Sequence, residues 1–172
     1  HNFDLLRKEN HEQMVELINS SLPENAGIVR IHVAGDFFSL PYMHAWYVVA
    51  LMNPNTLFYA YTKSTSWWVG GINEFPILHN FVLTASMGGT QDHVTENYGL
   101  RKAVVVFSEA EAAELGLEID HDDSHAAKPS LRNQDFALLI HGTQPAGSKA
   151  AQALKELKGK GSYSRKKKET VS

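Results

Sequence analysis

Short apolar runs alternate with amphipathic segments along this chain. Five runs are rich enough in β-branched, aromatic and aliphatic residues to be buried strands, which we predict at 28–34, 57–62, 81–85, 103–107 and 136–141. Helical periodicity or a helix-start signal predicts helices at 4–20, 39–52, 109–115 and 149–157. The glycine-rich, aromatic segment 67–76 is interpreted as a loop or short helix, and the polar segment 121–134 as a loop.

This alternation predicts an α/β fold, with a mostly parallel sheet of about five strands and flanking helices. The strands are nearly continuous apolar runs, as expected when both faces of a sheet are covered. Five strands are too few for a closed eight-stranded barrel, so an open sheet or an incomplete barrel-like sheet is expected. Right-handed crossovers would bring the carboxyl ends of the strands to one edge, where ligands bind in such folds.

The composition limits the classes of protein that this chain can be. Its 172 residues suit one domain, and we predict a single α/β domain at 1–158 followed by a basic, disordered tail at 159–172. The first residue is His1 rather than Met, so we expect an N-terminal part to be missing. No secretory signal is present, and no apolar run approaches the roughly 18 residues of a membrane span. With no cysteine, these residues support no disulfide, thiolate zinc site or iron–sulfur cluster.

Charge is distributed unevenly along the chain. Residues 149–172 hold eight basic and two acidic side chains, whereas residues 1–148 hold eight basic and seventeen acidic ones. A basic tail can contact the phosphates of nucleic acid, and it can equally be a solvated, disordered end. An acidic body would repel the same phosphates, so nucleic-acid binding is expected only through the tail.

Polar side chains stand at the ends of the first two predicted strands. Alternation along the first strand places His32 and Asp36 on one face, where the carboxylate could orient the imidazole for acid–base work. Lys63 ends the second strand, and there it could bind an anion or act as a nucleophile. These three residues are the candidate catalytic group. The structural alternatives are a core histidine, a loop-capping aspartate and a solvated lysine.

Two later strand ends carry candidate ligand-binding residues. Ser86 begins the segment Ser86-Met87-Gly88-Gly89-Thr90, whose consecutive amides could form an anion nest or an ordinary turn. His141 and Thr143 follow the last strand and lead to a helix start at Ser148, where free amides favour anions or are simply capped.

The densest group of potential metal ligands is His121-Asp122-Asp123-Ser124-His125. Oxygen and imidazole ligands suit a divalent metal such as zinc, manganese, iron or magnesium, with Asp122, Asp123 and His125 as the candidate ligands. This segment is expected to close over the pocket at the strand ends. A polar surface loop is the alternative interpretation.

Three motifs together resemble one known family. They are Arg-Ile-His-Val-Ala-Gly-Asp-Phe-Phe-Ser at 30–39, Phe-Tyr-Ala-Tyr-Thr-Lys-Ser at 58–64 and Asn-Phe-Val-Leu-Thr-Ala-Ser at 80–86. In this order they resemble the gene product 88 family of phage and phage-like proteins, over about residues 1–145. By motif position the resemblance points to Asp36, Lys63 and Ser86, and it implies a phage origin and action in the host cytoplasm.

Members of that family look distantly similar to radical-S-adenosylmethionine proteins and often carry cysteines upstream and near the last strand. This chain departs from that pattern, because Ile140-His141-Gly142-Thr143-Gln144 stands where the last strand would lead into cysteines. The resemblance therefore implies no iron–sulfur cluster here and indicates an origin more firmly than a reaction.

Three functional hypotheses follow. The first is an enzyme or small-molecule-binding protein with a polar pocket for a small anionic or metal-bound ligand at the strand ends. The second is an accessory protein without catalytic activity that binds a host or viral protein, since Trp67 and Trp68 could anchor an interface as readily as they could be buried. The third is nucleic-acid binding through the basic tail. Whether the protein is an enzyme is left open.

Overall fold

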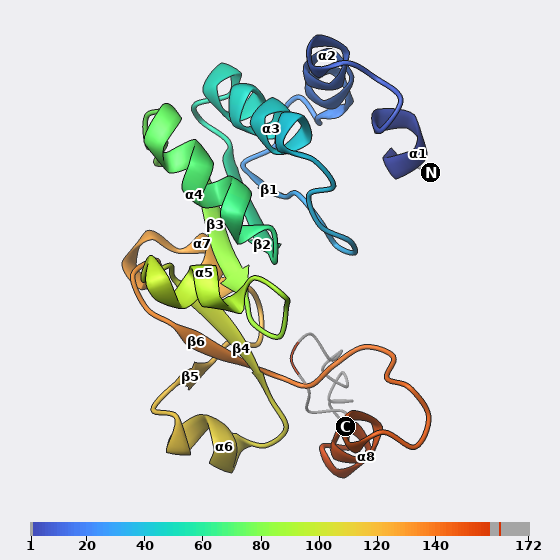
Figure 1. Cartoon of the computed structure of the whole chain (residues 1–172), viewed down its shortest axis with the longest axis vertical. Helices are drawn as coiled ribbons and strands as arrows, with labels where there is room; N and C mark the ends of the chain where they lie inside the picture. Colours follow the sequence, from blue (N-terminus) through green and yellow to red (C-terminus); the bar gives the residue numbers. More distant parts are fainter. Residues whose placement is uncertain (1, 159–161, 163–172) are drawn as a thin grey trace, which may run out of the picture. The chain divides into compact units, whose positions relative to one another are not determined.

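The computed structural model describes residues 2–158 and 162 (Figure 1). Contacts within the chain separate two compact units, 1–101 and 102–172, and each is described by itself. The prediction of a single domain at 1–158 stays a prediction, and the predicted disordered tail lies outside the described residues except for Ser162.

The first unit contains three strands and five helices among its described residues. In chain order they are α1 (Asn2–Leu6), α2 (His11–Ser21), β1 (Ile28–Arg30), α3 (Leu40–Met52), β2 (Leu57–Thr62), α4 (Thr65–Glu74), β3 (Phe81–Ser86) and α5 (Asp92–Asn97). The strands are parallel and lie in the order β1-β2-β3, with Val29 opposite Phe58 and Phe58 opposite Phe81.

The described part of the second unit has the same parallel arrangement on a smaller scale. Its elements are β4 (Lys102–Val106), α6 (Glu109–Glu114), β5 (Glu118–Ile119), α7 (Ser124–Ala127), the 3-10 helix η1 (Pro129–Leu131), β6 (Phe136–Leu139) and α8 (Lys149–Glu156). The strand order is β4-β6-β5. The α/β prediction is confirmed, because the strands are parallel, have flanking helices and do not close into a barrel. The described residues contain six strands rather than about five.

The N-terminal helix prediction was wrong in one respect. A single helix at 4–20 was expected, but α1 ends at Leu6 and α2 begins at His11. The reason is local, because Asn10 and Gln13 form a capping box, in which each side chain accepts a hydrogen bond from the other residue's backbone amide. This cap starts a new helix at His11.

The first strand is also shorter than predicted. A strand at 28–34 was expected, but β1 ends at Arg30, and Ile31 makes one more ladder bond, from its amide to the carbonyl of Tyr59 at 2.9 Å. The Arg30 Nε then donates to the carbonyl of His32 at 2.9 Å, and Gly35 takes a φ of 86°, which glycine reaches without strain. Residues 32–36 therefore form a loop, and the prediction that they alternate along a strand was wrong.

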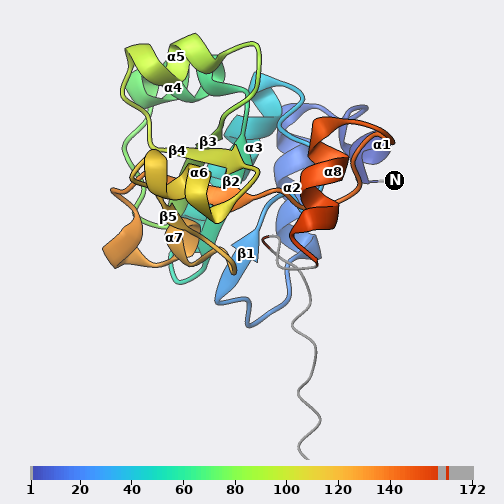
Figure 2. The ribbon, with the colours of Figure 1, turned by 90° about the horizontal axis from the view of Figure 1, so that it is seen from below.

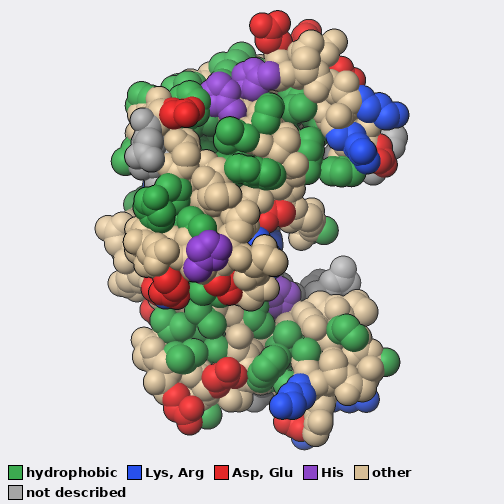
Figure 3. Space-filling view, viewed as in Figure 1, with side chains coloured by type: hydrophobic (Ala, Val, Ile, Leu, Met, Phe, Trp, Pro, Cys, Tyr) green, Lys and Arg blue, Asp and Glu red, His purple; other side chains and the backbone are tan. Residues whose placement is uncertain are grey.

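Helix α3 begins where its sequence signal predicted. The Ser39 side chain accepts a hydrogen bond from the Tyr42 amide, and Pro41 occupies the first turn. Helix α3 packs against α2, as Figures 1 and 2 both show. At this contact the ring of His11 stacks on that of His44, with centroids 4.7 Å apart. Figure 3 shows histidine side chains next to hydrophobic ones on one face of the molecule.

Several elements were missed or left open by the sequence analysis. The segment interpreted as a loop or short helix is the ten-residue helix α4, and its Trp67 and Trp68 are partly buried against the core. Helix α5 was not predicted, nor was the two-residue strand β5. The segment 121–134, interpreted as a loop, contains α7 and η1. All of these are short, so their periodicity is weak.

Each unit has its own apolar core. In the first unit, α2 and α3 bury Met14, Ile18, Val49 and Ala50 together with Phe58 of β2. In the second unit, a smaller cluster combines Val106, Ala112, Ala137 and Leu139. The larger core positions the loop from β1 to α3, which carries the candidate site. No helix of the described chain has the length and apolar character that crossing a membrane requires.

Candidate functional site

Asp36 holds the loop between β1 and α3 against the end of β2. Its Oδ1 accepts hydrogen bonds from the Phe37 amide at 2.7 Å and the Thr62 hydroxyl at 2.6 Å, and its Oδ2 accepts one from the Lys63 amide at 2.6 Å. Thr62 is almost fully buried. The carboxylate thus accepts three hydrogen bonds from the chain, and these bonds join the loop after β1 to the end of β2.

The predicted polar residues Lys63 and Ser86 also meet, although through backbone atoms of the second residue. The Lys63 Nζ donates to the carbonyl of Met87 at 3.0 Å and to that of Ser86 at 3.4 Å. The stem of Lys63 lies so close to Gly89 that a Cβ there would come within 3.3 Å of it. The lysine therefore ties the end of β2 to the turn that follows β3.

The glycine turn after β3 does form an anion nest, but the anion comes from the chain itself. The amides of Gly88 and Gly89 donate to the two carboxylate oxygens of Asp92, each at 2.9 Å. Consecutive amides that point at one carboxylate are the geometry of such nests. In this structure the chain fills its own nest with Asp92, the first residue of α5.

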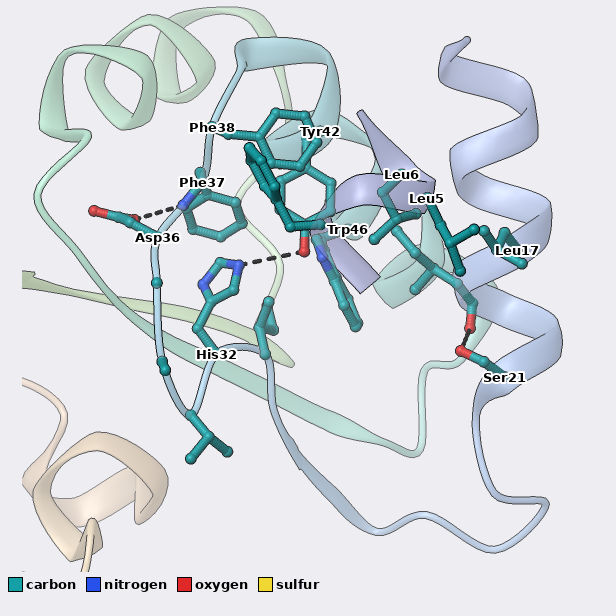
Figure 4. A pocket seen from close by; sticks show the side chains of 16 residues that line it. Leu5, Leu6, Leu17, Ser21, His32, Asp36, Phe37, Phe38, Tyr42 and Trp46 are labelled. Atoms are coloured by element: carbon teal, nitrogen blue, oxygen red, sulfur yellow. Dashed lines mark hydrogen bonds between the residues drawn. The ribbon is translucent and has the colours of Figure 1, made fainter. Parts of the chain in front are cut away.

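A pocket of about 960 Å³ opens at the end of β1, and we call it the β1-end pocket (Figure 4). The segment 31–38 forms one wall, and three helices supply the rest, namely α1 through Phe3, Leu5 and Leu6, α2 through Leu17, Ile18 and Ser21, and α3 through Tyr42 and Trp46. Its volume is that of a pocket for a drug-sized molecule, and most of the lining is aromatic or aliphatic.

His32 is the central polar side chain of the β1-end pocket. Its Nε2 lies 3.3 Å from the Tyr42 hydroxyl, and the edge of its ring meets Phe37 with centroids 4.7 Å apart. Its Nδ1 is buried and has no hydrogen-bond partner within residues 2–158 and 162. Burial lowers the pKa of His32, against a smaller opposing effect of the Asp36 charge, so the imidazole is neutral at pH 7.

An aromatic wall stands behind His32. The Phe38 and Tyr42 rings stack with centroids 4.3 Å apart, and Trp46 meets Tyr42 edge-on at 6.5 Å. Burial raises the pKa of Tyr42, and a smaller effect of the Trp46 side chain opposes the rise. The phenol is therefore protonated at neutral pH and can donate a hydrogen bond.

The other predicted ligand-binding residues lie in the second unit. The Nδ1 of His141 lies 2.9 Å from the carbonyl of Leu139, and Thr143 is exposed. Ser148 caps α8 by accepting a hydrogen bond from the Ala151 amide at 3.1 Å. These contacts are those of an ordinary strand exit and helix start.

The predicted metal-ligand segment is organised around Asp120, a residue that the sequence analysis did not select. The buried Asp120 carboxylate accepts hydrogen bonds from the amides of Asp122, Ser124 and His125, at 3.1 to 3.2 Å. Asp123 is also buried, and its backbone adopts the left-handed conformation, with a φ of 65°.

The side chains around this loop pair with each other. The Asp122 side chain accepts from Ser124, and this hydrogen bond lowers the pKa of Asp122. The His125 ring lies between two carboxylates: its Nε2 is 3.3 Å from the Glu118 Oε2, and its Nδ1 is 3.6 Å from the Asp120 Oδ2. Within the described residues, no three His, Cys, Asp or Glu side chains are grouped so that they could hold a metal ion.

The sequence analysis selected His32 and Asp36 but missed most of the pocket around them. Asp36 and Lys63 lie together at the strand ends, whereas His32 faces the β1-end pocket. The missed residues include the aromatic side chains of Phe37, Phe38, Tyr42 and Trp46. Tyr42 and Trp46 are four residues apart on a predicted helix, so they share its inward face, and this spacing could have identified them as neighbours of the loop.

The family model described as gene product 88 matches residues 1–158, so the chain belongs to the gene product 88 family. No curated protein and no solved structure matches it.

Proposed function

We propose that this chain, a member of the gene product 88 family of phage proteins, binds a small, uncharged and largely apolar molecule in the β1-end pocket. The observation that carries the proposal is a cavity of about 960 Å³ lined by aromatic and aliphatic side chains, with few polar groups among them. Pockets of this size and character hold cofactors and metabolites in other proteins. As a phage product, the protein would act in the host cytoplasm.

The charges around the pocket favour an uncharged ligand over the anionic one expected from the sequence. Among the described residues of the lining there is no Lys or Arg, and Lys63 is not part of it. The lining includes Asp36, whose negative charge would repel an anion. His32 is neutral at pH 7 because burial lowers its pKa, and Tyr42 keeps its proton.

Binding is better supported than catalysis. A catalytic acid or base needs a free proton site within reach of the substrate. Three donors occupy the Asp36 carboxylate, and two carbonyls hold the Lys63 amine. Among the residues that the structure describes, His32 is the only one of the three predicted catalytic residues with a side-chain polar atom that lacks a hydrogen-bond partner.

The hypothesis of a protein partner has weaker support. It rested on Trp67 and Trp68, and both are partly buried and packed against the core of the first unit. Nucleic-acid binding would use the basic residues from Lys155 to Lys168, and those after Lys158 lie outside the described residues.

The proposal can be tested with N-phenyl-1-naphthylamine, an uncharged dye whose fluorescence increases in apolar surroundings. Leu17 of α2 lines the pocket and Leu51 of α3 does not, and their side chains are 40% and 50% exposed. A tryptophan at position 17 would occupy part of the cavity. We expect saturable dye binding that Leu17→Trp weakens by about tenfold or more, whereas Leu51→Trp leaves it within about twofold.

Two results would contradict this proposal. One is the absence of saturable dye binding to the folded protein. The other is an equal loss of affinity in both variants, because the dye would then bind somewhere other than the β1-end pocket.

A further inference from the structure

Helix α1 forms one side of the β1-end pocket, and little apolar packing holds it there. Its three apolar side chains, Phe3, Leu5 and Leu6, all line the cavity, and Figure 4 labels Leu5 and Leu6 among the lining side chains. Leu6 is 8% exposed, whereas Phe3 and Leu5 are 49% and 45% exposed. Across residues 3–13, Leu6 is the only buried one. The apolar contact of α1 with the first unit therefore depends mainly on Leu6, with an edge-on contact between the Phe3 and Phe38 rings, whose centroids are 5.1 Å apart.

The segment between α1 and α2 has the features of a hinge. The amides of residues 7–9 donate to carbonyls within α1 itself, at 3.0 to 3.1 Å. Helix α2 begins at its own capping box of Asn10 and Gln13, so its first turn does not depend on α1. Residues 7–10 therefore join two helices that form separately, and Figure 1 shows a loop between them.

The length of α1 makes its position depend on packing. A helix of five residues is too short to be stable through its own hydrogen bonds. Elements with few buried apolar contacts open locally at a lower free energy than the core requires. Because Phe3 and Leu5 line the cavity and are about half exposed, a ligand in the pocket would cover both and add the apolar contact that α1 lacks.

We propose that α1 is a lid of the β1-end pocket, which opens about residues 7–10 in the free protein and is held closed by a bound ligand. The inference rests on the proposed function. The ligand contacts Phe3 and Leu5 only when the lid is closed, so it binds the closed form more tightly and shifts the equilibrium towards it. A closed lid in turn slows the release of the ligand.

The absence of cysteine from the sequence allows a direct test. Leu6→Cys and Ile18→Cys each place a single thiol at a buried position that lines the pocket, the first on α1 and the second on α2. Methyl methanethiosulfonate entering through the mouth of the cavity would reach both positions alike, so the second variant controls for this route. We expect the thiol at position 6 to react at least about thirtyfold faster than the thiol at position 18, because α1 opens locally and α2 does not.

The same reaction measures the coupling between ligand and lid. N-phenyl-1-naphthylamine at ten times its Kd leaves about one pocket in eleven empty, so the reaction at position 6 should slow by about tenfold. Equal reaction rates at positions 6 and 18, or a rate at position 6 that bound dye leaves unchanged, would overturn the inference and leave the proposed function in place. Failure of the dye to bind would remove the proposed function, and ligand-coupled closure with it.

The wild-type chain provides a second measurement, in which no side chain is changed. Amide hydrogen exchange of Arg7, Lys8 and Glu9 reports the opening of α1, because these amides donate to its carbonyls and a helix this short loses such bonds once it leaves the pocket. We expect them to exchange at least about tenfold faster than amides in the middle of α2, and to slow by about tenfold with the dye at ten times its Kd. Protection equal to that of α2 in the free protein would overturn the inference, whatever the thiol reactions show.

Discussion

Two ends of one short loop in the first unit use polar side chains in opposite ways. At Asp36 every hydrogen bond that the structure gives the carboxylate ends on the chain itself, and these bonds join the loop to the end of β2. At His32, four residues earlier, one ring nitrogen contacts Tyr42, and the other is buried without a hydrogen-bond partner in the described part of the chain. At the first end both carboxylate oxygens have hydrogen-bond partners, and at the second end one ring nitrogen has none among the described residues.

The difference separates two roles that look alike in the sequence. A polar residue at the end of a strand can hold the fold together or meet a ligand, and its type does not decide between them. What decides is whether the chain itself satisfies the hydrogen-bonding groups. By this measure we assign Asp36, Lys63 and the Gly88–Gly89 turn to the scaffold, and we propose His32 as a residue of the site.

The largest effect on stability is expected when the hydrogen bonds of Asp36 are removed. Asp36→Ala removes three hydrogen bonds to a carboxylate and leaves the buried hydroxyl of Thr62 without this acceptor. We expect the free energy of unfolding to fall by about 3 kcal/mol, measured by urea denaturation.

Asp36→Asn is the matched control, since its amide oxygen can still accept at the position of Oδ1 while the contact at Oδ2 is lost. It should cost about half as much as Asp36→Ala. If Asp36→Ala kept full stability and abolished dye binding, Asp36 would belong to the ligand site and the comparison would fail.

A smaller effect is expected at Lys63. Lys63→Met keeps the apolar stem that packs on Gly89 but removes the amine that donates to the carbonyls of Ser86 and Met87. Because the lysine is exposed, we expect a loss of about 0.5 kcal/mol in the free energy of unfolding.

Dye affinity in Lys63→Met should be unchanged, since Lys63 does not line the β1-end pocket. A loss of affinity without a loss of stability would return Lys63 to the group of ligand-binding residues.

The fold could largely be predicted from sequence because its strands are short, dense apolar runs. The predicted strand 57–62 coincides with β2, and 81–85 differs from β3 by one residue. Helix starts with a local chemical signal were also predicted correctly, as at Ser39 and Ser148. Such signals are local, so one sequence contains all of the information they need.

The site could be predicted only in part because its geometry is not local. The apolar run at 28–34 has the pattern of a strand, yet β1 ends at Arg30, whose guanidinium bonds to the carbonyl of His32. Because the strand ends there, residues 32–36 form a loop. Whether Asp36 contacts a ligand or Thr62 depends on residues 26 positions apart, which no local pattern specifies.

The smallest expected effect is a change in the pH dependence of stability, and it concerns His32. Burial lowers the pKa of His32 in the folded protein, so below the ordinary histidine value of about 6.5 the unfolded chain binds more protons than the folded one. Stability contributed by the neutral imidazole is therefore lost as the pH falls through this value towards the folded-state pKa. His32→Phe should flatten the decline of unfolding free energy between pH 7 and pH 5.

His93→Phe is the matched control, because the His93 side chain of α5 is exposed in the folded protein. The decline should keep its wild-type slope in this control. Asp36 provides the second comparison, because its charge favours the protonated form of His32 and thereby opposes the effect of burial. In Asp36→Asn the decline with falling pH should be steeper than in the wild type, and a flatter one would mean that the two ends of the loop are coupled in some other way than through charge.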